Sequence, residues 1–208
     1  MCGIVGYVGH RPVQEILLSG LEQLEYRGYD SAGISVQGED GLEAVRAVGN
    51  LAHLRTAVAA REGEEQGAVA VLAPPATTGI GHTRWATHGR VCEANAHPHC
   101  DTGDRVHVVV NGIVENYIAL KRELVQDGAI FTSETDAEVI AHLISRHLDG
   151  GALVDAVRLA YARLRGHYAF VAVAADEPGV IVAARKECPL VVGRGDGEQF
   201  LALSLIHI

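Results

Sequence analysis

The chain has 208 residues and a formal net charge of -9 at pH 7, and 48% of its residues are apolar. This length suits one domain with a sizeable core, the negative charge argues against a nucleic-acid-binding surface, and no stretch approaches the roughly 20 apolar residues of a membrane span. The N-terminus lacks the basic segment of a signal peptide and the cysteines form no CxxC pair, so we expect reduced thiols, a cytoplasmic location and neither a nucleic-acid nor a membrane partner.

The predicted elements begin with a buried strand at 2–8 and an amphipathic helix at 13–25, followed by a loop at 27–31. Further strands are predicted at 32–37, 42–47, 68–73, 79–85, 106–110, 167–174, 179–184 and near 190 and 200. Further helices are predicted at 50–60, 115–127, 135–148 and 152–164. Strands and helices come in blocks, which favours an α+β sandwich of two largely antiparallel sheets over a parallel doubly wound sheet.

Cys2 directly follows the initiator methionine and becomes the N-terminal residue if Met1 is removed. A thiol and a free α-amine then share one residue, and their ordinary pKa values of about 8.5 and 7.7–8 let the amine take the thiol proton near neutral pH. An N-terminal nucleophile of this kind is a known arrangement for acyl transfer. The alternative is that Cys2 merely starts a buried strand.

The segment 81–89 concentrates several polar groups and the only tryptophan, Trp85, at the end of a predicted strand. Arg84 in this segment could bind a carboxylate through two parallel hydrogen bonds. The alternative is a strand edge with a packed tryptophan and a solvated arginine.

The pair Asn111-Gly112 follows the strand predicted at 106–110 and suits positive φ. A side-chain amide beside a sterically open backbone N–H is a candidate oxyanion hole, and the alternative is an ordinary turn. Asp136 is predicted in the first turn of the helix at 135–148, where Thr135 and Glu138 form a capping-box pattern. The helix dipole there favours a charged carboxylate, which could hold an ammonium group or simply cap the helix.

Several histidine and cysteine side chains lie between residues 82 and 100, and both residue types are common zinc ligands. The side chains are His82, His88, Cys92, His97, His99 and Cys100. Structural zinc sites usually show paired ligands at a recognisable spacing, and this cluster is irregular. We therefore expect no metal, and no other cofactor.

Taken together, the motifs closely resemble the N-terminal glutaminase domain of the glucosamine-6-phosphate synthases, which are class II glutamine amidotransferases. The stretches that carry the resemblance lie at 2–6, 27–33, 82–89, 95–99, 111–113 and 133–136. The Cys-Gly-Ile start is shared with other N-terminal-cysteine amidotransferases, whereas His-Thr-Arg-Trp-Ala-Thr-His-Gly at 82–89 is specific to the sugar-aminating branch. The resemblance implies an Ntn-hydrolase fold, a four-layer α/β/β/α sandwich, over residues 2–202.

The resemblance also implies a catalytic group. Cys2 would attack the side-chain amide of L-glutamine and form a thioester, with its own α-amine as the base. Asn111 and the Gly112 N–H would stabilise the oxyanion, and Arg27 and Gly28 would help to position the N-terminus. Hydrolysis of the thioester would release glutamate and ammonia.

A second group would bind the substrate. Arg84 would take the α-carboxylate of glutamine and Asp136 its α-ammonium, which together would select a free amino acid. Thr87 and His88 would shape the pocket, and Trp85 would belong to a loop that closes over bound glutamine.

Parts of the family pattern are missing or altered. The isomerase domains that bind fructose-6-phosphate are not encoded here, and the full-length enzyme is expected to be a homodimer. Residues 203–208 are hypothesised to be a foreign tail, and 61–78 reads as a surface insertion. Val110 and Ala137 replace a usual histidine and threonine. Other readings are an amidotransferase domain of purine synthesis, which the segment at 82–89 disfavours, and a catalytically silent binding domain, which should have lost Cys2, Arg84 or Asp136.

Overall fold

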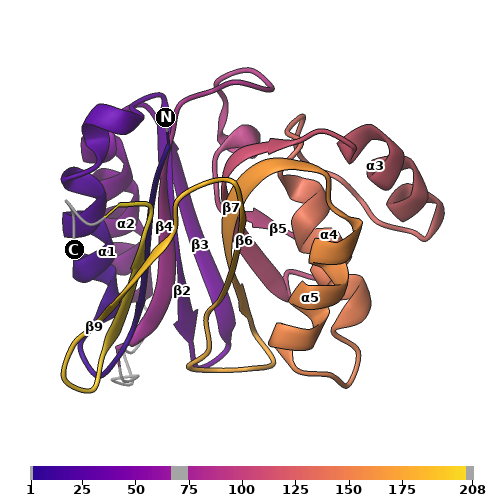
Figure 1. Cartoon of the computed structure of the whole chain (residues 1–208). Helices are drawn as coiled ribbons and strands as arrows, with labels where there is room; N and C mark the ends of the chain where they lie inside the picture. Colours follow the sequence, from indigo (N-terminus) through magenta and orange to yellow (C-terminus); the bar gives the residue numbers. More distant parts are fainter. Residues whose placement is uncertain (1, 67–74, 205–208) are drawn as a thin grey trace.

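The computed structural model describes residues 2–66 and 75–204 (Figure 1). Its helices are α1 Val13–Glu22, α2 Leu51–Gln66, α3 Tyr117–Gln126, α4 Glu138–His147 and α5 Leu153–Arg163, with short 3-10 helices η1 Glu25–Arg27 and η2 Glu93–Asn95. Its strands are β1 Gly3–Val8, β2 Ser31–Gly38, β3 Gly41–Val48, β4 Thr78–Arg84, β5 His99–Cys100, β6 Val106–Val114, β7 Gly166–Ala174, β8 Val182–Lys186, β9 Val191–Arg194 and β10 Gln199–Ala202.

The strands of the described residues form two sheets. The first has the order β3-β2-β4-β1-β10-β9, and every pair in it is antiparallel. The second has the order β5-β6-β7-β8 and is also antiparallel. Strand β1 therefore lies between β4 and β10, which come from the middle and the far end of the described chain.

The sheets stack face to face between helices (Figure 1). Helices α1 and α2 cover the outer face of the first sheet, and a core centred on Leu17, Leu21 and Leu54 fills that interface. Helices α4 and α5 cover the outer face of the second sheet. Between the sheets, Ile4 and Ile80 pack with residues of β6 and β7. The predicted α+β sandwich of antiparallel sheets is confirmed.

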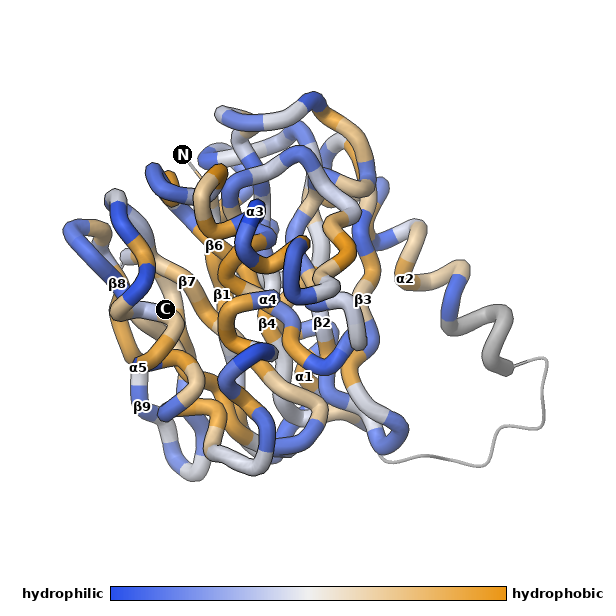
Figure 2. Tube along the Cα trace, turned by 90° about the vertical axis from the view of Figure 1, so that its right-hand side faces the viewer, coloured by the Kyte–Doolittle hydropathy of each residue, from blue (hydrophilic) through white to orange (hydrophobic). Residues whose placement is uncertain are grey.

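In Figure 2 the strands are largely hydrophobic and the connecting loops largely hydrophilic. Tyr168 and Phe170 on β7 are among the large side chains with no exposed surface. Within the described ranges, no helix is both long enough and apolar enough to cross a membrane.

The structure corrects several predicted boundaries. The helix predicted at 13–25 ends at Glu22 and gives way to η1. Between the strands predicted at 79–85 and 106–110, the structure adds η2 and the two-residue strand β5. The strand predicted to stop at residue 110 continues to Val114. The strand predicted at 68–73 and most of the hypothesised tail lie outside the described residues. Leu203, the first residue of that hexapeptide, is buried in the core between the sheets.

Candidate active site

Strand pairing brings Cys2 beside Arg84. Gly3 at the start of β1 is paired with Thr83 near the end of β4, and the Gly3 N–H donates to Thr83 Oγ1 at 3.1 Å. A side chain on Gly3 would collide with Thr83 and Leu24, so the absence of a Cβ permits this close approach. The residue before Gly3 and the residue after Thr83 therefore meet at the same edge of the first sheet.

A cavity of about 320 Å³ opens at this edge, and it collects eight of the ten predicted site residues. These are Cys2, Arg84, Trp85, Thr87, His88, Asn111, Gly112 and Asp136. The remaining lining residues are His97, Val110, Ile113, Thr135 and Ala137. Cys2 directly before β1, the end of β4 with the loop after it, β6 and the segment before α4 thus contribute to one cavity.

Arg27 and Gly28 are the two predicted site residues that the lining does not include. Gly28 lies against the strand that holds Arg84, because a Cβ on it would approach the Arg84 carbonyl carbon to 2.6 Å. The Arg27 Nη1 donates to Ser204 Oγ at 3.4 Å. Both residues contact the framework behind the cavity rather than the cavity itself.

The Cys2 thiol is in a partly desolvated position. Burial raises its pKa above the ordinary value, and its Sγ lies 3.9 Å from the Trp85 carbonyl oxygen. Because a protonated thiol is a poor nucleophile, Cys2 needs a nearby base.

Arg84 organises the loop that follows its own strand. Its side chain is only 4% exposed, and its guanidinium donates to the carbonyl oxygens of His88 at 2.5 Å and Arg90 at 3.3 Å. These contacts hold the loop that follows β4, and Arg84 is also one of the residues that line the cavity. Arg84 therefore both shapes the pocket and presents positive charge to it.

Trp85 lies at the mouth of the cavity with 47% of its surface exposed. Its ring packs edge-to-face against Tyr29, with 5.6 Å between ring centroids. The next residue is tied down, since the Ala86 N–H donates to the Asp30 carboxylate. The segment 29–30 thus supports the loop that carries the tryptophan.

Asn111 and Gly112 lie within β6, so the prediction that the strand ends before them was wrong. The pairing with β7 continues through Asn111↔Ala169 and Gly112↔Tyr168. Gly112 has φ +123°, the positive value expected for it. A Cβ there would meet the His167 carbonyl oxygen and would come within 2.6 Å of Tyr168 Cα. Glycine at this position therefore allows both the positive φ and the close approach of β7.

Asp136 also lines the cavity. Its Oδ2 accepts a hydrogen bond from the Val114 N–H at 2.6 Å, and its Oδ1 lies 4.0 Å from His88 Nδ1. The side chain is 5% exposed. It lies before α4 rather than in its first turn, because the helix begins only at Glu138.

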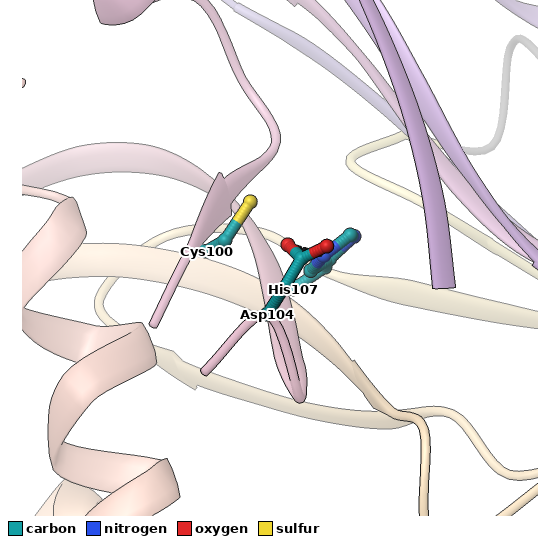
Figure 3. Close-up of side chains that lie close together, drawn as sticks. All are labelled: Cys100, Asp104 and His107. Carbon is teal, nitrogen blue, oxygen red and sulfur yellow. Dashed lines mark hydrogen bonds and ion pairs between the residues drawn. The ribbon is translucent and has the colours of Figure 1, made fainter. Parts of the chain in front are cut away.

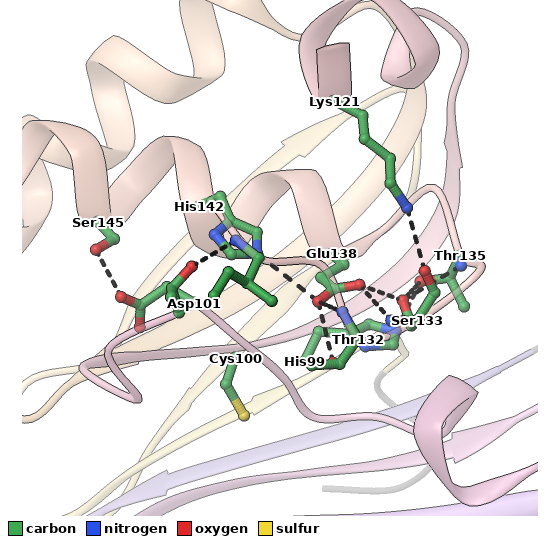
Figure 4. A network of polar contacts seen from close by, with 12 residues as sticks. His99, Cys100, Asp101, Lys121, Thr132, Ser133, Thr135, Glu138, His142 and Ser145 are labelled. Carbon is green, nitrogen blue, oxygen red and sulfur yellow. Dashed lines mark hydrogen bonds and ion pairs between the residues drawn. The ribbon is translucent and has the colours of Figure 1, made fainter. Parts of the chain in front are cut away.

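The start of α4 is held by a polar network instead of the predicted capping box (Figure 4). Glu138 accepts hydrogen bonds from the backbone N–H groups of Thr132 at 2.7 Å and Ser133 at 2.8 Å. Burial opposes its charge, but His142 and these donors hold its pKa below the ordinary value. Thr135 Oγ1 contacts His99 Nε2 at 2.9 Å rather than a helix N–H. The carboxylate therefore folds the segment back on itself and aims Asp136 at β6.

One group of potential metal ligands lies close together within the described part of the chain, and it differs from the cluster tested in the sequence. Its members are Cys100, Asp104 and His107, whose ligand atoms lie within 4.8 Å of one another (Figure 3). Asp104 Oδ1 already pairs with His107 Nε2 at 2.8 Å, and the Arg46 guanidinium lies 3.9 Å from Cys100 Sγ. Burial raises the pKa of Cys100 to about 12. These contacts describe a His–Asp pair beside a neutral thiol and an arginine.

The two-sheet sandwich with a cysteine at the start of its central strand is that of an Ntn-hydrolase amidotransferase. Residues 82–208 match the model of the glutamine amidotransferase domain family, and the chain belongs to that family.

Curated relatives give a more particular likeness. The chain is 49% identical to the glutamine–fructose-6-phosphate aminotransferase (isomerizing) of Gloeobacter violaceus, with 97% of this chain and 32% of the relative covered. It is 50% identical to the protein of the same name from Symbiobacterium thermophilum, with 97% and 31% covered. The chain thus spans about a third of the length of the curated relatives it matches.

Solved structures share the fold at lower identity. One is the glutamine phosphoribosylpyrophosphate amidotransferase from B. subtilis complexed with ADP and GMP, with a TM-score of 0.74, 26% identity, and coverage of 97% of this chain and 41% of that chain. Another is described as the allosteric regulatory enzyme of purine biosynthesis, with a TM-score of 0.77, 27% identity, and coverage of 97% and 42%.

Sequence reasoning had not assigned five lining residues to the pocket. His97 was named only as a metal candidate and Thr135 only as a helix cap, although both lie in stretches that carry the family resemblance. Val110, Ile113 and Ala137 line the cavity because they flank predicted site residues on the same segments. Adjacency to those residues was the one signal that could have found them.

Proposed function

We propose that this domain hydrolyses the side-chain amide of L-glutamine through a thioester on Cys2, and that the ammonia serves to make glucosamine-6-phosphate in a full-length enzyme. The observation that carries the proposal is that one cavity joins Cys2, Arg84 and Asp136. A thiol, a cation and an anion are the groups needed to attack the side-chain amide while holding the α-carboxylate and the α-ammonium of a free amino acid.

The first step is attack by Cys2 Sγ on the amide carbon. The thiol proton passes to the α-amine of Cys2, which becomes free once Met1 is removed. The carbonyl oxygen becomes an oxyanion, and the Asn111 side-chain amide and the Gly112 N–H donate to it. Removing one donor of this kind typically costs about 10²–10³ in rate.

Collapse of the tetrahedral intermediate breaks the carbon–nitrogen bond. The leaving nitrogen takes the proton from the α-ammonium of Cys2 and departs as ammonia. Water then attacks the thioester carbon, gives its proton to the same α-amine and releases glutamate, which restores the thiol. One group thus acts as base in each attack and as acid in each departure.

Substrate selection follows from the two opposite charges that line the cavity. Arg84 is almost fully buried on the β4 side, and Asp136 is almost fully buried on the α4 side. Burial strengthens both interactions relative to water. His88 lies between them, 4.0 Å from Asp136, and Thr87 completes the wall. Trp85 covers the mouth, and Arg27 and Gly28 support the edge at which Cys2 lies.

The wider role is proposed from the relatives of 47–50% identity, which carry the name glutamine–fructose-6-phosphate aminotransferase. Fructose-6-phosphate would bind to domains that lie outside this third of the protein, the full-length enzyme would be a homodimer, and its location would be cytoplasmic. The domain would comprise residues 2–202, with residues 203–208 a foreign tail. For the isolated chain we expect weak glutaminase activity and no sugar amination.

Intact-protein mass spectrometry after incubation with 6-diazo-5-oxo-norleucine, a reactive glutamine analogue, tests the proposal. The expected product lacks Met1 and carries one adduct, and protection by glutamine places that adduct in the substrate pocket. The Cys2→Ala variant is the matched control and should stay unlabelled. Labelling of that variant to the same extent, or a folded and processed wild-type chain without label, would refute the proposed nucleophile.

A further inference from the structure

The backbone of Val110, directly before Asn111, reaches the edge of the second sheet without a strand beside it. Strand β7 pairs with β6 along its whole length. On the other side, β5 pairs only through His99↔Val108 and Cys100↔His107. Val110 therefore lies just beyond the end of β5, where its N–H and C=O need other partners in a buried position.

Two histidine rings supply those partners. The Val110 N–H donates to His97 Nδ1 at 3.3 Å, and His82 Nε2 donates to the Val110 carbonyl oxygen at 2.9 Å. Both contacts are buried. His82 lies on β4 of the other sheet, so its ring crosses the interface between the sheets to reach β6. The two rings thus satisfy the backbone N–H and C=O of Val110, which a longer β5 would otherwise pair with.

The contacts require one tautomer in each ring. His97 must leave Nδ1 without a proton to accept, and His82 must carry its proton on Nε2 to donate. Burial lowers the pKa of His82 to about 3 and that of His97 well below its ordinary value. Both rings are therefore neutral near pH 7, as these roles demand.

The rings are held in place from several directions. They stack with 4.1 Å between centroids, and His99 packs against His97 at 4.3 Å. His99 is in turn fixed by Thr135, next to Asp136. On the far side, Gly33 leaves room for the His97 carbonyl oxygen, which a Cβ at that position would overlap. Position 33 therefore requires glycine, because any side chain there would displace the backbone of His97.

We propose that His97 and His82 are positioning residues for the oxyanion hole: by binding both backbone groups of Val110, they set where the Asn111 amide and the Gly112 N–H point. The inference rests on the proposed function. Neither ring is assigned a contact with substrate. A displacement of the hole by about 1 Å is enough to cost on the order of a hundredfold in rate.

The test replaces each of the two histidines by asparagine and, separately, by glutamine. Asparagine places a polar atom near the position of imidazole Nδ1, and glutamine places one near Nε2. His97→Asn should therefore keep the acceptor and His97→Gln should lose it, whereas His82→Gln should keep the donor and His82→Asn should lose it. His107→Asn and His107→Gln are controls on the same strand, because that buried ring bonds to Ser35 and Asp104 instead.

Glutamine hydrolysis by the 208-residue chain is measured as kcat and KM separately. We expect the two retaining variants to stay within threefold of wild-type kcat, and the two losing variants to fall about tenfold to a hundredfold with KM within threefold. At position 97 the asparagine variant should have the higher kcat, and at position 82 the glutamine variant should have the higher kcat. A general loss of stability would make the same amide, asparagine or glutamine, the better one at both positions. That result, or an equal kcat in all four variants, would overturn the inference.

A second readout does not depend on turnover. The backbone amide signals of Asn111 and Gly112 in ¹⁵N NMR spectra should stay in place in the retaining variants and move in the losing ones; signals that move equally in all four would also overturn the inference. Failure of the proposed function is separate: it would appear as a folded, processed wild-type chain that neither hydrolyses glutamine nor differs from Cys2→Ala.

Discussion

Replacing Gly112 by alanine should abolish most turnover by moving one backbone N–H. At φ +123° an alanine is strained by about 1–3 kcal/mol. Its Cβ would also come within 2.6 Å of Tyr168 Cα, where real Cβ atoms keep at least 3.0 Å. Strands β6 and β7 must therefore separate by several tenths of an ångström at the oxyanion hole. Loss of that one donor predicts a fall in kcat of about 10²–10³.

The assay couples glutamate release to glutamate dehydrogenase, and thermal unfolding is followed by circular dichroism. Gly128→Ala is the matched control, because Gly128 also has positive φ (+96°) but has open space around its Cβ position and lies outside the cavity. Its kcat should be unchanged, and its strain of about 1–2 kcal/mol should lower Tm by a few degrees. A Gly112→Ala variant with wild-type kcat would refute the assignment of this N–H to the oxyanion hole.

Three further predictions concern the thiol, the ammonium site and pH. Cys2→Ala should lose glutamine hydrolysis while its Tm stays within a few degrees of wild type; substantial residual turnover would mean another nucleophile. Asp136→Asn can still accept the Val114 N–H but loses its charge, so KM for glutamine should rise about tenfold to a hundredfold, and an unchanged KM would exclude an ammonium contact. Burial lowers the pKa values of three histidines, so these rings stay neutral in the folded chain and take up protons on unfolding below pH 6.5. Between pH 6.5 and 4.5, urea titrations should show stability falling by up to about 1.4 kcal/mol per pH unit for each ring, and a pH-independent free energy of unfolding there would contradict the neutral state of His82, His97 and His99.

Much of the fold could be predicted because its strands carry simple patterns. A strand was predicted at 167–174, and β7 confirms it, with every residue from Tyr168 to Ala174 buried. Leu17 and Leu21 on α1 recur at helical spacing and lie in the core. The candidate site residues before β1, at the end of β4 and on β6 were proposed because each lies in a short motif with unusual chemistry. Their convergence on one cavity then followed from strand pairing.

The sequence could not show features that depend on distant partners. Asn111-Gly112 has the composition of a turn, but pairing with Tyr168 on β7 keeps it within a strand. Thr135 and Glu138 have the spacing of a capping box, but Glu138 binds the backbone of Thr132 and Ser133 instead. The histidine contacts to Val110 join residues 13 and 28 positions apart. Local periodicity carries no information about such pairings.

The position of β1 between β4 and β10 has a consequence during synthesis. Strand β1 is made first, but its second neighbour, β10, spans Gln199–Ala202. At about 5–20 residues per second, a ribosome needs roughly 10–40 s to make the intervening chain. Throughout this interval one edge of β1 is unpaired and the sheet around it is incomplete. The proposed removal of Met1 therefore has a window in which an aminopeptidase meets a flexible nascent end, before folding closes the strand that carries the nucleophile.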